Sequence, residues 1–225
     1  KSLQLPVHYG INMAVTKKIS RNVELIGAMK KASFSFVNIG LESGSERVRR
    51  DILRRPGYSN QDLIEFCKTA RAHSMAVNLF ILIGVPGETV DDFRQTVDCA
   101  KRCLPRNCML SIFYPYVGTR LYDVAKDQKL IGDTLDTRNE RGRAVLRMKE
   151  FPRWRIQYEF VTFHFKVFKG QMSFYKRVFY ILRRLISISP LLTSLYMSFV
   201  TRSRIGAVLS KSLSRSALRN LDAQG

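Results

Sequence analysis

The chain has 225 residues, the size of one moderate domain or of one domain with an appendage. Hydrophobic residues make up 45% of it and aromatic residues 11%, which is enough for a packed core and excludes an intrinsically disordered chain. The formal net charge of +20 is uneven: residues 1–135 hold 20 basic and 13 acidic side chains (net +7), and residues 136–225 hold 18 and 5 (net +13). Such a basic surface either attracts polyanions, such as nucleic acid or anionic lipid, or is an ordinary solvated face.

The four cysteines, Cys67, Cys99, Cys103 and Cys108, lack the spacing of a disulfide scaffold. This usage indicates a reduced, cytoplasmic protein. No apolar segment that resembles a signal peptide opens the chain. The chain starts at Lys1, without a methionine and in sequence typical of the middle of a domain, so we expect it to be a piece of a longer polypeptide.

The first 135 residues alternate between strand-like and helix-like segments. We predict strands over residues 7–15, 34–41, 76–83 and 109–114, and helices over residues 20–31, 45–53, 59–73, 90–102 and 120–128. Ser20 is the expected N-cap of the first helix, and the apolar run 76–83 is typical of a parallel strand covered on both faces. The alternation predicts an α/β fold with a parallel sheet, whose ligands bind at the C-terminal ends of the strands. Four strands do not close a barrel, so we expect more of the sheet upstream.

A polar segment directly follows the second predicted strand. The carboxylate of Glu42 can accept hydrogen bonds from a ribose diol or an ammonium group, and Gly44 would let a ligand approach the backbone closely. Alternatively, the segment is an ordinary helix start, with Ser43 or Ser45 as the cap and Glu46 in the first turn.

The next two predicted strands end in turns rich in glycine and proline. Residues 84–89 (GVPGET) read as a tight turn that leads into a helix, with Thr89 as its cap and Glu88 as an alternative ligand contact. Residues 114–119 (YPYVGT) place backbone hydrogen-bonding groups beside Tyr114 and Tyr116. These groups can read an adenine edge with a tyrosine as a wall, or one tyrosine can pack in the core.

Three segments in this order resemble the cobalamin-binding type of the radical S-adenosylmethionine (SAM) superfamily: residues 38–45 (NIGLESGS), 83–89 (IGVPGET) and 114–123 (YPYVGTRLYD). The resemblance covers residues 7–130 and implies the last strands of a partial (β/α)6 barrel. It also implies a [4Fe-4S] cluster that cleaves S-adenosylmethionine to a 5′-deoxyadenosyl radical, which abstracts a hydrogen from the substrate. The cofactor-binding residues implied by the resemblance are Glu42, Ser43 and Gly44 near the ribose or amino-acid part, Leu82 and Gly84 at the adenine pocket, and Tyr114, Pro115 and Tyr116 at the adenine edge.

The chain departs from this family in its cysteines. The cluster-binding motif CxxxCxxC is not in the sequence, so we expect the cluster ligands to lie outside this chain, together with any cobalamin-binding domain. Cys99, Cys103 and Cys108 have a different spacing and are expected to be core or surface cysteines. We therefore assign no catalytic residue and no metal ligand here, and expect the fragment alone to be inactive.

Residues 136–225 are predicted to form a basic, mainly helical extension. Within it, residues 174–185 place apolar side chains on one helical face and most basic ones elsewhere, as in an amphipathic basic helix. Residues 185–200 are uncharged but contain Pro190, and are too short and interrupted for a membrane span. For residues 163–200 we keep three roles: docking on the barrel, peripheral contact with a membrane and, less favoured, contact with nucleic acid.

The leading functional hypothesis is a fragment of a radical SAM enzyme that modifies a small molecule, lipid or natural product. A tRNA-modifying enzyme similar to the methylthiotransferases ranks lower, because those relatives usually append a β-rich module or an acetyltransferase whereas this extension reads as helical. The non-enzymatic alternative is a basic module that binds membranes or nucleic acid.

Overall fold

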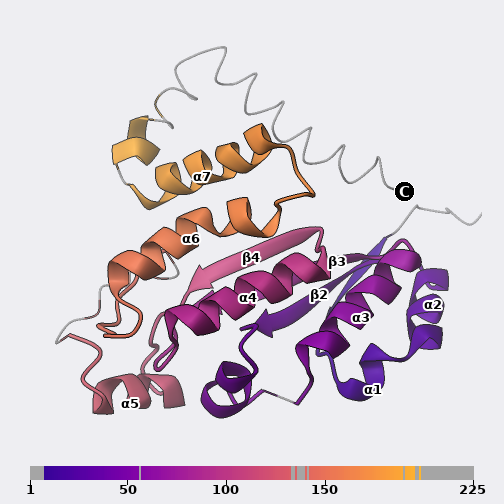
Figure 1. The fold of residues 1–225 in the computed structure, drawn as a ribbon, viewed down its shortest axis with the longest axis horizontal. Coiled ribbons are helices and arrows are strands. Elements are labelled where there is room, and N and C mark those ends of the chain that lie inside the picture. Colours follow the sequence, from indigo (N-terminus) through magenta and orange to yellow (C-terminus); the bar gives the residue numbers. More distant parts are fainter. Residues whose placement is uncertain are drawn as a thin grey trace, which may run out of the picture. The chain divides into compact units, whose positions relative to one another are not determined.

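Four parallel strands form the sheet of this α/β fold. A computed structural model describes residues 8–55, 57–132, 135, 140, 142–189, 191–195 and 198. The strands are β1 (Tyr9–Met13), β2 (Phe34–Glu42), β3 (Ala76–Ile83) and β4 (Asn107–Ile112). They pair side by side in sequence order and all run the same way, so their C-terminal ends share one edge (Figure 1). The predicted parallel α/β architecture is confirmed.

Helices connect and follow the strands: α1 (Lys17–Ser20), α2 (Val23–Lys31), the π-helical turn η1 (Val48–Ile52), α3 (Asn60–Ala72), α4 (Val90–Cys103), α5 (Arg120–Asp127), α6 (Arg153–Val167) and α7 (Phe174–Ile188). Ser59 and Thr89 cap α3 and α4, each in a capping box with the aspartate three positions on. The prediction that Ser20 caps a helix is wrong. Thr16 starts a separate short helix that ends at Ser20, and the side chain of Asn22 caps α2.

The sheet has one covered face and, within the described part of the chain, one open face. Along β3, Val77, Leu79, Ile81 and Ile83 are buried, whereas the residues between them are only half-buried. The helices lie on the buried side: α2 packs on β2, α3 on β3 and α6 on β4 (Figure 1). The expectation that residues 76–83 are covered on both faces is therefore not met by the described residues. A four-stranded sheet does not curl far enough to enclose its second face.

A row of asparagines crosses the open face. Asn12, Asn38, Asn78 and Asn107 stand in register on the four strands. The side-chain Nδ2 of Asn38 donates to Oδ1 of Asn12, and Nδ2 of Asn78 donates to Oδ1 of Asn38, each at 2.9 Å. Because side-chain amides are costly to bury without further partners, this row favours a water-filled or ligand-filled space over a packed core on the open side.

Contacts divide the chain into two compact units, residues 1–178 and residues 179–225. α6 belongs to the first unit, where Phe163 packs against Phe93 of α4 with ring centroids 5.9 Å apart. The predicted boundary at residues 135 and 136 adjoins residues outside the described range and stays a prediction.

The second unit is described over residues 179–189, 191–195 and 198, and these residues are largely helical. Within it, Oγ1 of Thr193 donates to the carbonyl oxygen of Ile186 at 2.7 Å. Phe179, Leu182 and Leu185 are exposed on α7. None of the helices in the described ranges combines the length and apolarity that crossing a bilayer requires. The rest of the predicted extension, including residues 201–225, lies outside the described residues.

Candidate functional site

The three sequence motifs meet at the C-terminal edge of the sheet. They directly follow β2, β3 and β4, which are neighbouring parallel strands. This edge is where open α/β sheets bind their ligands. The expected convergence of the three segments is confirmed, and the orientation of each side chain then decides which residues can face a ligand.

Glu42 ends β2 on the open face. Its φ of 59° is uncommon for a residue other than glycine, and its side chain folds back over Gly40. Its Oε1 accepts a hydrogen bond of 2.5 Å from Nη2 of Arg55, whose side chain is 50% exposed. Burial raises the pKa of the Glu42 carboxyl, and the charge of Arg55 opposes this shift. Glu42 is thus a hydrogen-bond acceptor whose one ion-pair partner among the described residues is a solvent-exposed side chain that a ligand can displace.

Ser43 and Gly44 turn away from the open face and pack against α4. Oγ of Ser43 lies 3.2 Å from Oγ1 of Thr96, and the Gly44 N–H donates to the same oxygen at 2.8 Å. A Cβ atom on Gly44 would lie 2.5 Å from Cα of Thr96 and 2.7 Å from the carbonyl oxygen of Gln95. We expected the absence of a side chain at Gly44 to let a ligand approach the backbone, and this explanation is wrong. The absence of a side chain lets α4 approach instead, and the helix occupies that space. The assignment of both residues as cofactor contacts stays a prediction.

A charged clasp ties the loop after β2 to the loop after β3. Asp92 accepts hydrogen bonds from Oγ of Ser45 at 2.6 Å and from Nη2 of Arg47 at 2.5 Å. The same Arg47 nitrogen donates to the carbonyl oxygen of Gly87 at 2.9 Å. Burial alone would raise the pKa of Asp92, but hydrogen bonds from Arg47, Ser45 and Thr89 lower it to about 2. Asp92 is therefore ionised at neutral pH and fixes the two loops relative to each other.

The buried carboxyl group of Glu88 accepts hydrogen bonds from the backbone of the turn after β3. Glu88 is 1% exposed, and its Oε2 accepts hydrogen bonds from the N–H groups of Gly84 at 2.6 Å and Val85 at 3.3 Å. Burial raises its pKa to about 8, although the two N–H donors oppose the shift. The carboxyl is therefore mostly protonated at neutral pH. This geometry supports a role in the turn rather than the alternative role as a ligand contact.

Leu82 and Gly84 lie on different sides of the sheet edge. Leu82 is half-buried on the open face, in register with Ser111 of β4. Gly84 has a φ of 83°, and a Cβ atom there would lie 3.1 Å from Cδ1 of Ile156 in α6. Leu82 is thus placed to contact a ligand on the open face, whereas the surroundings of Gly84 are set by the covering helix.

The aromatic segment after β4 contains one buried and one exposed tyrosine. Tyr114 and Pro115 are buried, whereas Tyr116 is 44% exposed. The two tyrosine rings meet edge to face with centroids 5.2 Å apart, and the Tyr116 hydroxyl donates to Glu140. Core packing therefore applies to Tyr114, and Tyr116 is the ring available as a wall.

All four cysteines are buried free thiols, so of the two expected placements, core and surface, the core applies: Cys67 in α3, Cys99 and Cys103 in α4, and Cys108 in β4. A hydrogen bond with Cys103, together with burial, raises the pKa of Cys99, and burial raises the pKa of Cys108 to about 12. The described residues hold no group of three or more His, Cys, Asp or Glu side chains able to bind a metal. Thiols enclosed between helices and sheet do not fit a [4Fe-4S] cluster, which needs converging thiolates.

The roles of two arginines at the site were not predicted from the sequence. Arg55 pairs with Glu42, and the buried Arg49 donates from Nη1 to the carbonyl oxygen of Ser43 at 2.6 Å. Arg49 also binds Oδ1 of Asn60 at 2.8 Å. Nothing in their spacing indicates these partners, because the contacts arise only when the loop folds back on the end of β2. The asparagine row was detectable in principle, since each of its first three members interrupts an apolar strand.

Comparison with known proteins agrees with this architecture. Residues 5–100 match the family model of the Radical SAM superfamily. The chain also resembles the solved structure of coproporphyrinogen III oxidase (HemN) from Escherichia coli, described as a radical SAM enzyme, with a TM-score of 0.50 and 15% identity over 72% of this chain and 32% of that one. At this identity the likeness shows the fold alone.

Curated proteins are similar to part of this chain. An uncharacterized methyltransferase of Pyrococcus horikoshii is 31% identical over 110 residues, which are 49% of this chain and 24% of the relative. A tRNA-2-methylthio-N(6)-dimethylallyladenosine synthase of Pelotomaculum thermopropionicum is 36% identical over 84 residues, 36% of this chain and 18% of the relative. A threonylcarbamoyladenosine tRNA methylthiotransferase of Danio rerio is 33% identical over 89 residues, 38% of this chain and 16% of the relative. The chain thus spans a quarter or less of the length of these relatives.

Proposed function

We propose that the open face of this sheet binds S-adenosylmethionine at its C-terminal edge, with Glu42 as the principal contact from this chain. The observation that carries the proposal is the position of Glu42: it ends a parallel strand of a radical SAM segment, faces the open side, and has a displaceable partner in Arg55. A carboxylate in this position can accept hydrogen bonds from the ribose hydroxyls or the ammonium group of the cofactor.

The surrounding residues fit the cofactor. Leu82 offers an apolar surface on the same face, and Tyr116 offers an exposed ring at the neighbouring strand end. The loops after β2 and β3 are held together by the Asp92 clasp rather than by the ligand. The site is therefore preorganised, which lowers the entropic cost of binding. When bound, S-adenosylmethionine supplies the radical chemistry that defines the superfamily.

Exchanging Glu42 for glutamine tests this assignment. A charge-assisted hydrogen bond contributes about 1.5–3 kcal/mol, so Glu42→Gln should weaken S-adenosylmethionine binding by roughly ten- to a hundred-fold. The measurement is calorimetric titration of the full-length protein. Glu65→Gln, which changes an exposed carboxylate on α3, is the matched control and should leave the affinity unchanged. Equal affinities for wild type and Glu42→Gln would remove Glu42 from the site.

For the whole protein we propose a radical SAM enzyme whose cluster ligands lie outside this chain, since the four buried thiols do not fit that role. The cobalamin-binding subtype, a cobalamin cofactor, a cytoplasmic location and the inactivity of this fragment alone stay predictions.

Two substrate classes remain candidates. The leading hypothesis from the sequence was a small molecule, lipid or natural product, with peripheral membrane contact through residues 163–200. The printed names of several relatives favour tRNA instead, although the match covers less than a quarter of each of those enzymes. Parallel binding assays with tRNA and with vesicles containing anionic lipid discriminate the two: retention of tRNA without vesicle binding would reject the lipid hypothesis, and the reverse would reject tRNA.

A further inference from the structure

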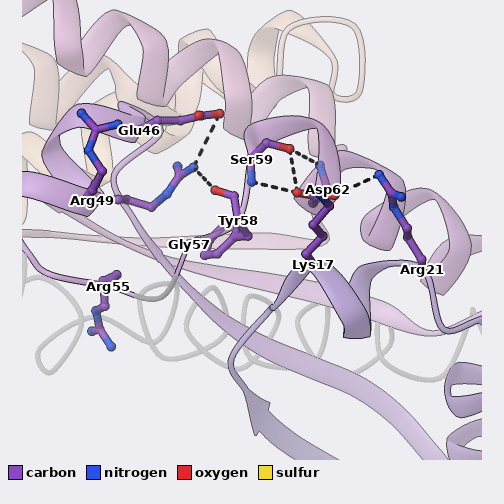
Figure 2. Close-up of a pocket in the computed structure, with 10 residues that line it drawn as sticks. Lys17, Arg21, Glu46, Arg49, Arg55, Gly57, Tyr58, Ser59 and Asp62 are labelled. Carbon is purple, nitrogen blue, oxygen red and sulfur yellow. Dashed lines mark hydrogen bonds and ion pairs between the residues drawn. The ribbon is translucent and has the colours of Figure 1, made fainter.

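A basic pocket of about 410 Å³ lies on the first unit, between α1, η1 and the start of α3 (Figure 2). The residues that line it are Lys17, Arg21, Glu46, Arg49, Arg50, Arg55, Gly57, Tyr58, Ser59 and Asp62. A volume in this range suits a small ligand rather than a single ion. Apart from Arg55, the lining does not include the residues proposed above for S-adenosylmethionine.

The charges of the lining do not balance. Five lining side chains are cationic and two, Glu46 and Asp62, are anionic, which leaves a net charge of +3. Lys17 makes no hydrogen bond or ion pair through Nζ within the part of the chain that the structure describes. Arg21 reaches Asp62 only at 3.9 Å, and Arg50 pairs with an exposed aspartate. Exposed ion pairs contribute little to stability, so these cations are available to a ligand.

Arg49 forms the fixed wall of the pocket. It is 2% exposed, and its guanidinium lies 4.5 Å from the ring centroid of Tyr58. Its hydrogen bonds go to neutral oxygens, including the carbonyl of Tyr58 at 3.1 Å, and its ion pair within the described chain is Glu46 at 4.0 Å. A buried charge is stable only when it is paired and hydrogen-bonded, so Arg49 is short of negative charge nearby.

Tyr58 itself also lines the pocket, next to Arg49. Its hydroxyl is buried and has no hydrogen-bond partner among the described residues, and burial raises its pKa to about 12.

The N-terminus of α3 does not supply the binding groups, because its own side chains already satisfy it. Asp62 accepts from Ser59 N at 2.9 Å, and Ser59 Oγ accepts from Asp62 N at 3.1 Å (Figure 2). Glu46 accepts from Asn60 N at 2.8 Å. A ligand here is therefore recognised by side-chain cations. Several cations that approach one cavity from three elements suit a group with oxygens pointing in several directions, such as phosphate, better than a planar carboxylate.

We propose that this pocket binds a phosphate or diphosphate group, with Arg49 as the buried anchor and Lys17, Arg21 and Arg50 as the outer cations. Since Arg49 also holds the carbonyl of Ser43, the bound anion would stiffen the loop that follows Glu42. The proposal goes beyond cofactor binding and does not depend on it.

Pyrophosphate is the probe, titrated calorimetrically into the full-length protein at low ionic strength. The double variant Lys17→Ala/Arg50→Ala should weaken binding at least ten-fold. The control Arg71→Ala/Lys101→Ala removes two exposed cations elsewhere and should stay within two-fold of wild type. Affinity for S-adenosylmethionine should be the same in both variants, which separates this test from that of Glu42. Absence of binding by wild type to any phosphate probe, or equal loss in the two variants, would overturn the proposal.

A second binding experiment, with RNA, distinguishes a nucleic-acid phosphate from the phosphate of a free molecule. A short single-stranded RNA that binds wild type, and loses affinity only in the pocket variant, would assign the group to a nucleic-acid backbone. Pyrophosphate binding without RNA binding would assign it to a free phosphorylated molecule. Both results support a phosphate site, and failure of both probes rejects it.

Discussion

Two carboxyl groups of this site, those of Asp92 and Glu88, have different roles because they have different hydrogen-bond donors around them. Asp92 accepts hydrogen bonds from three residues and stays ionised, whereas Glu88, four residues earlier, is buried with two backbone donors and holds its proton to about pH 8. One oxygen of Glu88, Oε1, has no partner among the described residues. The two carboxyl groups near the start of α4 therefore act differently. Asp92 is a fixed negative charge, and Glu88 is a neutral group that binds the backbone of the turn.

The neutral form of Glu88 predicts a specific dependence of stability on pH. Its pKa rises from 4.5 to about 8 on folding, so its contribution is fully present below pH 4.5 and is lost as the pH rises to about 8. Within this window the loss is on the order of 1 kcal/mol per pH unit. Glu88→Gln keeps a neutral side chain and should flatten the slope, measured by urea unfolding at several pH values. Glu65→Gln is the control, and an unchanged slope in Glu88→Gln would contradict the assignment.

At the scale of elements, local sequence predicted the helices with local caps. The helix from Asn60 starts where predicted because Ser59 and Asp62 form a capping box within four residues. The first helix was misplaced because Thr16 and Asn22 cap two separate helices, whereas Ser20 is buried at the end of the first and its hydroxyl donates to Asp62 at 3.5 Å.

At the site, too, features set by local sequence were predictable, and contacts between residues distant in sequence were not. The position of Glu42 at a strand end followed from the alternation of elements, whereas its pairing with Arg55 depends on a loop that folds back across 13 residues. The packing of Gly44 on α4 joins residues 52 apart in sequence, so no local pattern indicates it.

The packing of Gly44 predicts that alanine is destabilising at Gly44 but not at Gly57. Gly44→Ala would place Cβ against the backbone of Thr96 in α4, which has to shift, so we expect a loss of about 1–3 kcal/mol in the free energy of unfolding. Gly57→Ala meets nothing within 4 Å and should be close to neutral. Thermal or urea denaturation measures both. Equal stabilities would show that α4 does not pack on Gly44 in this way.

At the scale of the molecule, the described sheet has the form of part of a barrel. Helices cover one face, an asparagine ladder lines the other, and the three motif loops share one edge. The resemblance to HemN and the match to the Radical SAM superfamily agree with this form. The excess of positive charge in residues 136–225 has no counterpart in the matched segment, so the partner of the extension is a separate question from the identity of the cofactor.

Photolabelling with an azido analogue of S-adenosylmethionine tests the central claim most directly, because it reports where the cofactor lies without assuming any one residue. The full-length protein is irradiated with the analogue, digested, and the modified peptides are mapped by mass spectrometry, with excess S-adenosylmethionine as competitor. We predict competed labels in the strand ends and loops of residues 40–45, 80–84 or 114–118, on the open side of the sheet. Labels confined to the outer surfaces of α2, α3 or α5 would contradict the account.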